Sequence, residues 1–127
     1  MAEPARATRQ LIAVLEFTTD GGAAAMAELL DVHPDLDAVF VASDLVARGA
    51  LTTLAERGLR VPQDVAVVGF DNLPRAASGG IGLTSVSQPS TGMGVRMAEV
   101  LLQLLSGQHP EPQATILPTE LVVRESS

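Results

Sequence analysis

The stretch V-P-Q-D-V-A-V-V-G-F-D-N, from Val61 to Asn72, decides the fold of this chain. It consists of a proline-led turn, a dense apolar run, a glycine and a carboxylate. An apolar run between turn residues predicts a strand buried on both faces, as in parallel sheets. Asp71 follows where that strand leaves its sheet, and open parallel sheets bind ligands at this edge. Asp71 is therefore the first candidate for a functional side chain; the alternative is that it caps a turn, which an Asp-Asn pair also favours.

The residues before this stretch alternate between short apolar runs and helical patterns. In chain order, the predicted elements are a strand over Leu11–Leu15, a turn over Thr18–Gly22, a helix through Ala23–Leu30, a buried strand over Ala38–Ala42, a helix over Leu45–Arg57 and the strand Val65–Phe70. Ser43 or Asp44 is expected to cap the second helix, and Gly58 to end it. Strands alternating with helices at these spacings predict βαβ units, a parallel sheet and an α/β fold. Phe40 and Phe70 lie inside the apolar strands and are expected in the core.

The pattern changes after Asn72. Residues 73–82 contain three glycines and show no periodicity, which predicts a mobile loop. After the short run T-S-V-S, apolar residues at helical spacing predict an amphipathic helix over Gly92–Ser106, ended by Gly107. Glu120–Arg124 is expected to form a strand at the edge of the sheet.

Composition limits the classes of function. The chain has 127 residues, 46% of them hydrophobic, enough for one domain with a core. Its net charge is −7 and its eight cations, all arginine, are scattered, which argues against a nucleic-acid groove. No cysteine is present, and no apolar run approaches the roughly 18 residues that span a bilayer. No membrane contact and a soluble, cytoplasmic protein are expected.

The sequence shows no pattern of a catalytic or cofactor site. His33 and His109 each lie beside a proline in a polar loop, so neither resembles a metal ligand or a catalytic base. No G-x-S-x-G motif occurs, and the glycines of residues 79–82 lack the lysine of a phosphate-binding loop. We therefore expect no enzymatic activity, no cofactor and no metal.

Four ordered blocks resemble a known family. D-A-V-F-V-A-S-D-L-V-A-R-G-A-L, G-L-R-V-P-Q-D-V-A-V-V-G-F-D-N, L-T-S-V-S-Q-P and I-L-P-T-E-L-V-V-R-E-S-S are similar to the sensor domain of the LacI/GalR regulators of transcription. The resemblance implies the periplasmic-binding-protein fold, in which two α/β subdomains enclose a small ligand, usually a sugar or a nucleobase. It implies an incomplete sandwich, mainly the C-terminal subdomain. Residues 1–10 would be a polar N-terminal segment, 11–88 the C-terminal sensor subdomain, 89–117 a crossover and helix of the N-terminal subdomain, and 118–127 a returning strand and tail.

The resemblance also implies ligand-binding residues. Asp71 would accept hydrogen bonds from ligand hydroxyls, and Phe17 would stack on the ligand ring unless it lies in the core. Ser43 and Asp44 correspond to the pair at a strand end from which the family reaches the ligand; the alternative for both is capping the helix. Gln88 would reach the cleft from the hinge, or serve only as a polar hinge residue.

The predicted function is that of an effector-binding sensor in a homodimeric regulator. The family contacts DNA through a helix-turn-helix that has no counterpart in this sequence, so the chain is expected to be part of a regulator and to bind ligand weakly by itself. The helix over Gly92–Ser106 would then expose an apolar stripe. The alternatives are a solute-binding protein of a sugar uptake system, an enzyme on an α/β scaffold, or a fragment without activity.

Overall fold

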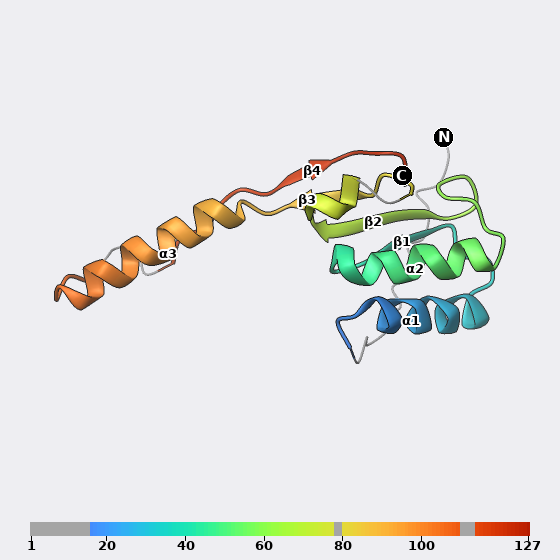
Figure 1. The fold of residues 1–127 in the computed structure, drawn as a ribbon, viewed down its shortest axis with the longest axis horizontal. Helices are drawn as coiled ribbons and strands as arrows, with labels where there is room; N and C mark the ends of the chain where they lie inside the picture. Colours follow the sequence, from blue (N-terminus) through green and yellow to red (C-terminus); the bar gives the residue numbers. More distant parts are fainter. Residues whose placement is uncertain (1–15, 78–79, 110–113) are drawn as a thin grey trace, which may run out of the picture.

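A computed structural model describes residues 16–77, 80–109 and 114–127 (Figure 1). The predicted strand Leu11–Leu15 lies outside the described residues. The elements, in order, are α1 (Thr19–Val32), β1 (Ala38–Phe40), α2 (Asp44–Glu56), β2 (Ala66–Asp71), the 3-10 helix η1 (Pro74–Ala77), β3 (Thr84–Ser87), α3 (Ser90–Leu105) and β4 (Glu120–Val122).

The strands form one mixed, mostly parallel sheet in the order β1-β2-β3-β4. β1, β2 and β3 run parallel, and β4 runs antiparallel to β3. β4 lies at the end of the strand order, as the sequence predicts. The register places Asp71 opposite Ser87, so the carboxyl ends of β2 and β3 meet at one edge of the sheet.

The two N-terminal helices start at side-chain caps. The Thr18 hydroxyl accepts from the Gly21 amide at 3.0 Å, and α1 begins at Thr19, so the predicted turn over Thr18–Gly22 is wrong for all but its first residue. The cap outweighs the low helix propensity of the two glycines in this first turn. Ser43 caps α2, and Gly58 follows its end with a φ of 71°, as expected from the sequence.

The core lies between the helices and one face of the sheet. Its buried side chains come from α1, α2, η1, β2 with the residue before it, and the residue before β3: Met26, Leu30, Ala47, Ala50, Leu54, Val65, Val67, Ala76 and Leu83. α1 and α2 lie side by side on this face (Figure 1). The loop predicted after Asn72 contains η1, which contributes Ala76 to the core.

The prediction that β1 and β2 are buried on both faces is wrong. Val65, Val67 and Gly69 are buried, whereas the alternate residues of β2 are only half-buried. Phe40 in β1 is 61% exposed, and its ring meets the half-buried ring of Phe70 edge-on at a centroid distance of 6.4 Å. In the part of the chain that the structure describes, α1 and α2 cover the Val67 face of the sheet and β1 ends the strand order, which explains the exposure of Phe40.

Residues near the C-terminus complete the sheet. The Val67 amide donates to the Ser126 carbonyl at 2.7 Å, and the Ser126 hydroxyl donates to the Val67 carbonyl at 2.6 Å. The same hydroxyl accepts from the Thr84 amide at 2.8 Å. Ser126 is fully buried, and its hydrogen bonds supply partners to Val67, the residue just before the first paired residue of β2 and β3.

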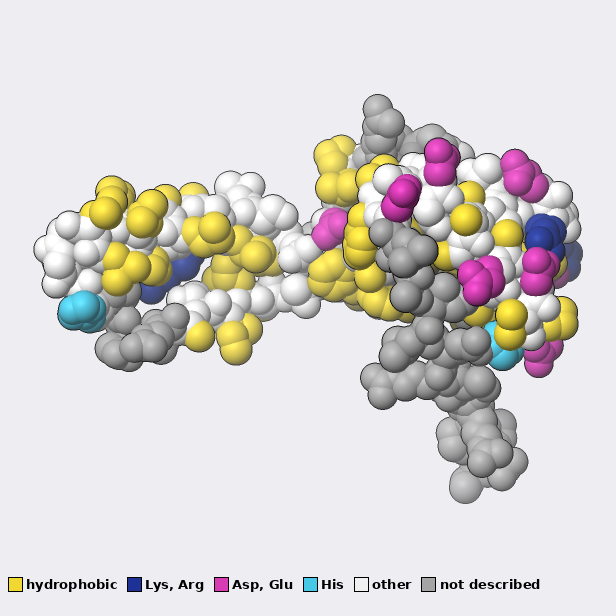
Figure 2. Space-filling model, turned by 90° about the horizontal axis from the view of Figure 1, so that it is seen from below, with side chains coloured by type: hydrophobic (Ala, Val, Ile, Leu, Met, Phe, Trp, Pro, Cys, Tyr) yellow, Lys and Arg dark blue, Asp and Glu magenta, His cyan; other side chains and the backbone are white. Residues whose placement is uncertain are grey.

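Helix α3 projects from the sheet as an arm (Figure 1). It begins at Ser90, two residues before the predicted start, and none of its residues is buried. Figure 2 shows hydrophobic side chains along this arm, while acidic side chains gather on the body of the protein. The predicted apolar stripe is therefore exposed; its most exposed members are Met97, Leu101 and Leu105. Within the described ranges, no helix has the length and apolar character needed to cross a membrane.

Candidate ligand-binding site

The carboxyl edge of the sheet carries the candidate site. Here β2 ends at Asp71 and β3 ends at Ser87, followed by Gln88 and the first turn of α3. An open cavity of about 490 Å³ lies at this edge. It is lined by Asp71, Asn72, Leu73, Pro74, Ser87, Gln88, Pro89, Ser90, Thr91 and Gly92.

The structure brings together two of the predicted residues. The Gln88 side-chain amide donates to Asp71 Oδ1 at 2.6 Å, and both side chains are half-buried. The second carboxylate oxygen of Asp71 can accept from a ligand, and the carboxamide oxygen of Gln88 adds a further acceptor. A carboxylate beside an amide suits a ligand with adjacent hydroxyl groups, because a carboxylate forms strong hydrogen bonds with such donors.

Asp71 and Asn72 have unusual backbone conformations. Their φ angles are 100° and 53°, in the region that side chains other than glycine rarely adopt. Asn and Asp tolerate this region better than other residues, at a cost on the order of 1 kcal/mol each. These two residues with positive φ, called the left-handed turn below, place the Asp71 carboxylate at the cavity.

Several side chains hold the left-handed turn. The Asn72 amide donates to Ser85 Oγ at 3.0 Å, and its carboxamide nitrogen donates to Ser87 Oγ at 3.3 Å. The carboxamide oxygen of Asn72 accepts from Arg124 Nη2 at 2.7 Å. The backbone amide of Asn72 and both polar groups of its side chain therefore have partners within the protein.

Asp44 is turned into the protein. Its side chain accepts from the Ser85 hydroxyl at 2.6 Å through Oδ1 and from the Leu73 amide at 2.8 Å through Oδ2, and the residue is only 2% exposed. Ser43 is also buried, and its hydroxyl accepts from the Leu45 amide at 3.3 Å as the cap of α2. Neither residue lines the described cavity at this edge. The capping alternative holds for Ser43, whereas Asp44 joins α2 to β3 and to the segment after Asn72.

Phe17 lies before the first turn of α1, 65% exposed. The alternative that it belongs to the core is therefore wrong. The first turns of α1 and α2 pack closely, since a Cβ atom added at Gly22 would meet the Val46 carbonyl. Phe17 thus lies just before the start of α1, which packs beside the start of α2. Its ring is accessible to a ligand or to solvent.

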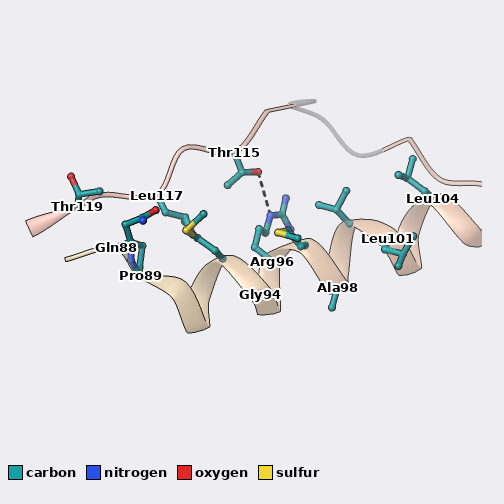
Figure 3. A pocket seen from close by; sticks show the side chains of 13 residues that line it. Gln88, Pro89, Gly94, Arg96, Ala98, Leu101, Leu104, Thr115, Leu117 and Thr119 are labelled. Carbon is teal, nitrogen blue, oxygen red and sulfur yellow. Dashed lines mark hydrogen bonds between the residues drawn. The ribbon is translucent and has the colours of Figure 1, made fainter. Parts of the chain in front are cut away.

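A second hollow adjoins the first. A groove of about 810 Å³ runs between α3 and residues 115–119, and Figure 3 shows its lining side chains. Gln88 and Pro89 line both hollows. The Arg96 Nε atom donates to the Thr115 hydroxyl at 3.4 Å across the groove (Figure 3). The groove walls are otherwise mainly apolar, with Met93, Met97 and Leu101 along α3.

Sequence reasoning missed four polar residues at this edge: Asn72, Ser85, Ser87 and Arg124. A signal for the two serines was present, because residues two apart on a strand point to the same face. In T-S-V-S this rule directs both hydroxyls to one side, where the strand pairing with β2 brings them to Asn72. No local pattern links Arg124 to Asn72, which lies 52 residues away in the chain. Across the part of the chain that the structure describes, no group of three or more His, Asp or Glu side chains could hold a metal ion.

The fold and the edge site define the class of protein. The family profile described as a periplasmic binding protein-like domain matches residues 2–127, and this chain belongs to that family. Its relatives are transcription regulators of the LacI type rather than enzymes. The regulator CelR of Thermobifida fusca is 49% identical over 116 residues, which are 91% of this chain and 34% of CelR. The repressor CytR of Escherichia coli K12 is 36% identical over 118 residues, 93% of this chain and 35% of CytR.

Solved structures agree with these relatives. The complex of CelR with cellobiose has a TM-score of 0.84 at 50% identity and covers 88% of this chain and 34% of that one. A LacI-family regulator from Arthrobacter sp. FB24 in complex with lactose has a TM-score of 0.79 at 36% identity, covering 88% and 43% of the two chains. The chain thus spans about a third of the length of the curated relatives that it matches.

Proposed function

We propose that this chain is the effector-binding part of a LacI-type transcription regulator and that its effector is a carbohydrate. The observation that carries the proposal is the Asp71–Gln88 pair, joined at 2.6 Å beside the cavity at the carboxyl edge. The pair supplies acceptors for adjacent hydroxyl groups, while Ser87 and Thr91 add hydroxyls to the same wall. Two structural relatives are complexes with the disaccharides cellobiose and lactose, which supports this ligand class.

The proposal assigns the binding residues specific roles. Asp71 and Gln88 bind hydroxyl groups, and Phe17, exposed before α1, stacks against a sugar ring. An aromatic face beside a few polar groups is a common lining for such ligands. Asp44 does not touch the ligand in this scheme, because both its oxygens accept hydrogen bonds inside the protein.

The proposal also divides the chain between two lobes. Residues 11–88 belong to one lobe, residues 89–117 pass into the second, and residues 118–127 return. Three observations support this division: α3 projects away from the sheet, β4 returns to pair with β3, and Gln88 lines both hollows at the junction. Ligand binding between lobes would favour their closed arrangement, and closure would alter DNA binding by parts of the regulator beyond the third matched here.

Mapping of ligand contacts by NMR tests the effector class. Backbone and side-chain amide signals of the full chain are followed while cellobiose, lactose or adenine is added at millimolar concentration. Under the proposal, a disaccharide shifts the signals of Asn72 and the Gln88 side chain, and Asp71→Asn abolishes these shifts. Asp35→Asn is the matched control, since it removes one charge from an exposed site away from the cavity. Shifts caused by adenine alone, or disaccharide shifts that persist in Asp71→Asn, would refute the carbohydrate site.

Self-association is the last part of the proposal. The resemblance implies homodimer contacts on the helix beginning near Asp44 and on the loop after Asp71, and a hollow of about 570 Å³ is lined on α2 by residues that include Arg48 and Thr52. Sedimentation velocity compares the chain with Thr52→Glu, which puts a charge on this exposed surface. Thr52→Glu is expected to break the proposed dimer and so to reduce the size of the assembly; a size distribution that Thr52→Glu leaves unchanged would exclude this interface.

A further inference from the structure

The left-handed turn at Asp71 and Asn72 has no glycine to accommodate its conformation. Two successive residues with positive φ are maintained only when their surroundings fix them. The turn is also the support of the Asp71 carboxylate, so whatever fixes the turn also fixes the geometry of the binding edge. Two of the groups that do so, Asp44 and Arg124, do not line the cavity.

Arg124 contacts the turn from the C-terminal segment. Its Nη2 donates to the Asn72 carboxamide oxygen at 2.7 Å, and its Nη1 donates to the Leu83 carbonyl at 2.6 Å. The planar guanidinium therefore joins the turn to the residue just before β3. The segment around Arg124 is itself fixed, because the Arg124 amide donates to Thr84 Oγ1 at 2.8 Å.

Asp44, at the start of α2, makes the second set of contacts with the turn. Its Oδ2 accepts from the Leu73 amide at 2.8 Å, immediately after the turn. Its Oδ1 accepts from Ser85, whose hydroxyl in turn accepts from the Asn72 amide at 3.0 Å. A buried anion and a half-buried cation therefore fix the turn through charge-assisted hydrogen bonds, which are the strong class.

We propose that Arg124 and Asp44 are positioning residues that fix the left-handed turn and thereby aim the Asp71 carboxylate at the effector. Neither lines the cavity, so neither binds the ligand directly. The effector-binding edge thus depends on a residue of the C-terminal segment, 52 residues beyond Asn72. The expected effect of Arg124 and Asp44 on ligand binding rests on the proposed function, whereas their effect on the turn does not.

The primary test needs no ligand. Chemical shifts of Asp71 and Asn72, which report their φ angles, and of the Gln88 side-chain amide are compared in the wild-type chain, Arg124→Ala and the control Arg57→Ala. Arg57 is also a paired arginine, since it bridges Asp31 at 2.8 Å on the helix surface. Arg124→Ala is expected to move all three sets of signals and Arg57→Ala none. Unchanged turn signals in Arg124→Ala would overturn the proposal, even if the variant were less stable.

A double-mutant cycle separates positioning from general stability. Asn72→Gly removes the acceptor for Arg124 and provides a residue that adopts positive φ without strain. In that background Arg124→Ala should no longer alter the Asp71 and Gln88 signals, because the contact through which it acts is absent. Equal effects of Arg124→Ala with and without Asn72→Gly would contradict the mechanism. Arg124→Lys, which cannot span both acceptors, replaces Arg124→Ala in both tests if the latter does not fold.

A ligand measurement completes the test. Cellobiose titrated by NMR into Arg124→Ala should bind about tenfold more weakly than into wild type, as expected for loss of a hydrogen bond to a charged group. Arg57→Ala should bind as wild type does. If cellobiose binds neither wild type nor variant, the carbohydrate proposal fails while the turn signals still decide the positioning role. Wild-type affinity in Arg124→Ala with a displaced turn would show that the turn does not control binding.

Discussion

Replacing Gly49 by alanine should destabilise the protein although alanine favours helices. Gly49 lies in α2 at a close approach to α1, where an added Cβ atom would meet the Thr19 carbonyl and lie 2.6 Å from the Ala23 backbone nitrogen. Both obstacles are backbone atoms, so the helices must separate. This separation loosens the contact beneath which Met26 and Leu54 are buried.

The magnitude follows from two opposing terms. Alanine in place of glycine inside a helix gains up to about 1 kcal/mol. Forcing an extra group into a packed interface costs about 1–3 kcal/mol, and the upper end applies because no flexible side chain can yield. The net loss should be about 2 kcal/mol of unfolding free energy, which lowers the midpoint of thermal unfolding by roughly 6–10 °C for a chain of this size.

The matched control for Gly49→Ala is Gly94→Ala. Gly94 is also a helical glycine, in α3, but a Cβ atom there would meet nothing within 4 Å. Only the propensity gain remains, so Gly94→Ala should leave the transition unchanged or raise it slightly. Both variants are compared with wild type by urea and thermal unfolding followed by circular dichroism. Gly49→Ala unfolding at or above the wild-type midpoint would refute the close helix contact.

Three further predictions concern charge, capping and the exposed arm. Arg60 lies 2.6 Å from Asp64 and lowers the pKa of the Asp64 carboxyl from 3.8 to about 2. The contribution of this pair to the free energy of unfolding should therefore be complete above pH 3.8 and lost as the pH falls through about 2. An NMR titration midpoint near 4 for Asp64 would contradict the pairing. Ser43→Ala should lower the unfolding free energy by about 1 kcal/mol in urea melts, because it removes the cap of α2, and an unchanged midpoint would show that the cap is dispensable. The chain should self-associate through α3, so sedimentation velocity should show smaller species after Leu101→Glu and Leu105→Glu, whose wild-type side chains are 55% and 76% exposed; an unchanged distribution would exclude α3.

The sequence predicted the elements better than their burial. Spacing and caps located α1, α2, β2 and α3 because those signals are local. Burial of Phe40 depends on what covers the outer face of the sheet, which no pattern within β1 records. The apolar run alone therefore suggested a two-sided environment that the described structure does not provide.

The candidate site divides in the same way. Asp71 was predictable because strand exits in parallel sheets are known binding positions, and Gln88 followed from the family resemblance. The role of Asp44 was not predictable, since its position at a helix start suggests a cap whereas its partners are Ser85 and Leu73. Arg124 acts across 52 residues of sequence, beyond the reach of any local signal.

The pairing of Ser126 with Val67 sets an order for folding during synthesis. The hydrogen bonds from residue 126 complete a part of β2 made 59 residues earlier. Until the ribosome has released that late segment, the amide and carbonyl of Val67 lack their partners, and an unpaired strand edge is prone to pair with other chains. Pairing of residues far apart in the sequence also slows folding, since the chain between them must lose conformational entropy before the stabilising contacts form. Newly made chains should therefore pass through a state with an open edge that depends on rapid completion or on a chaperone.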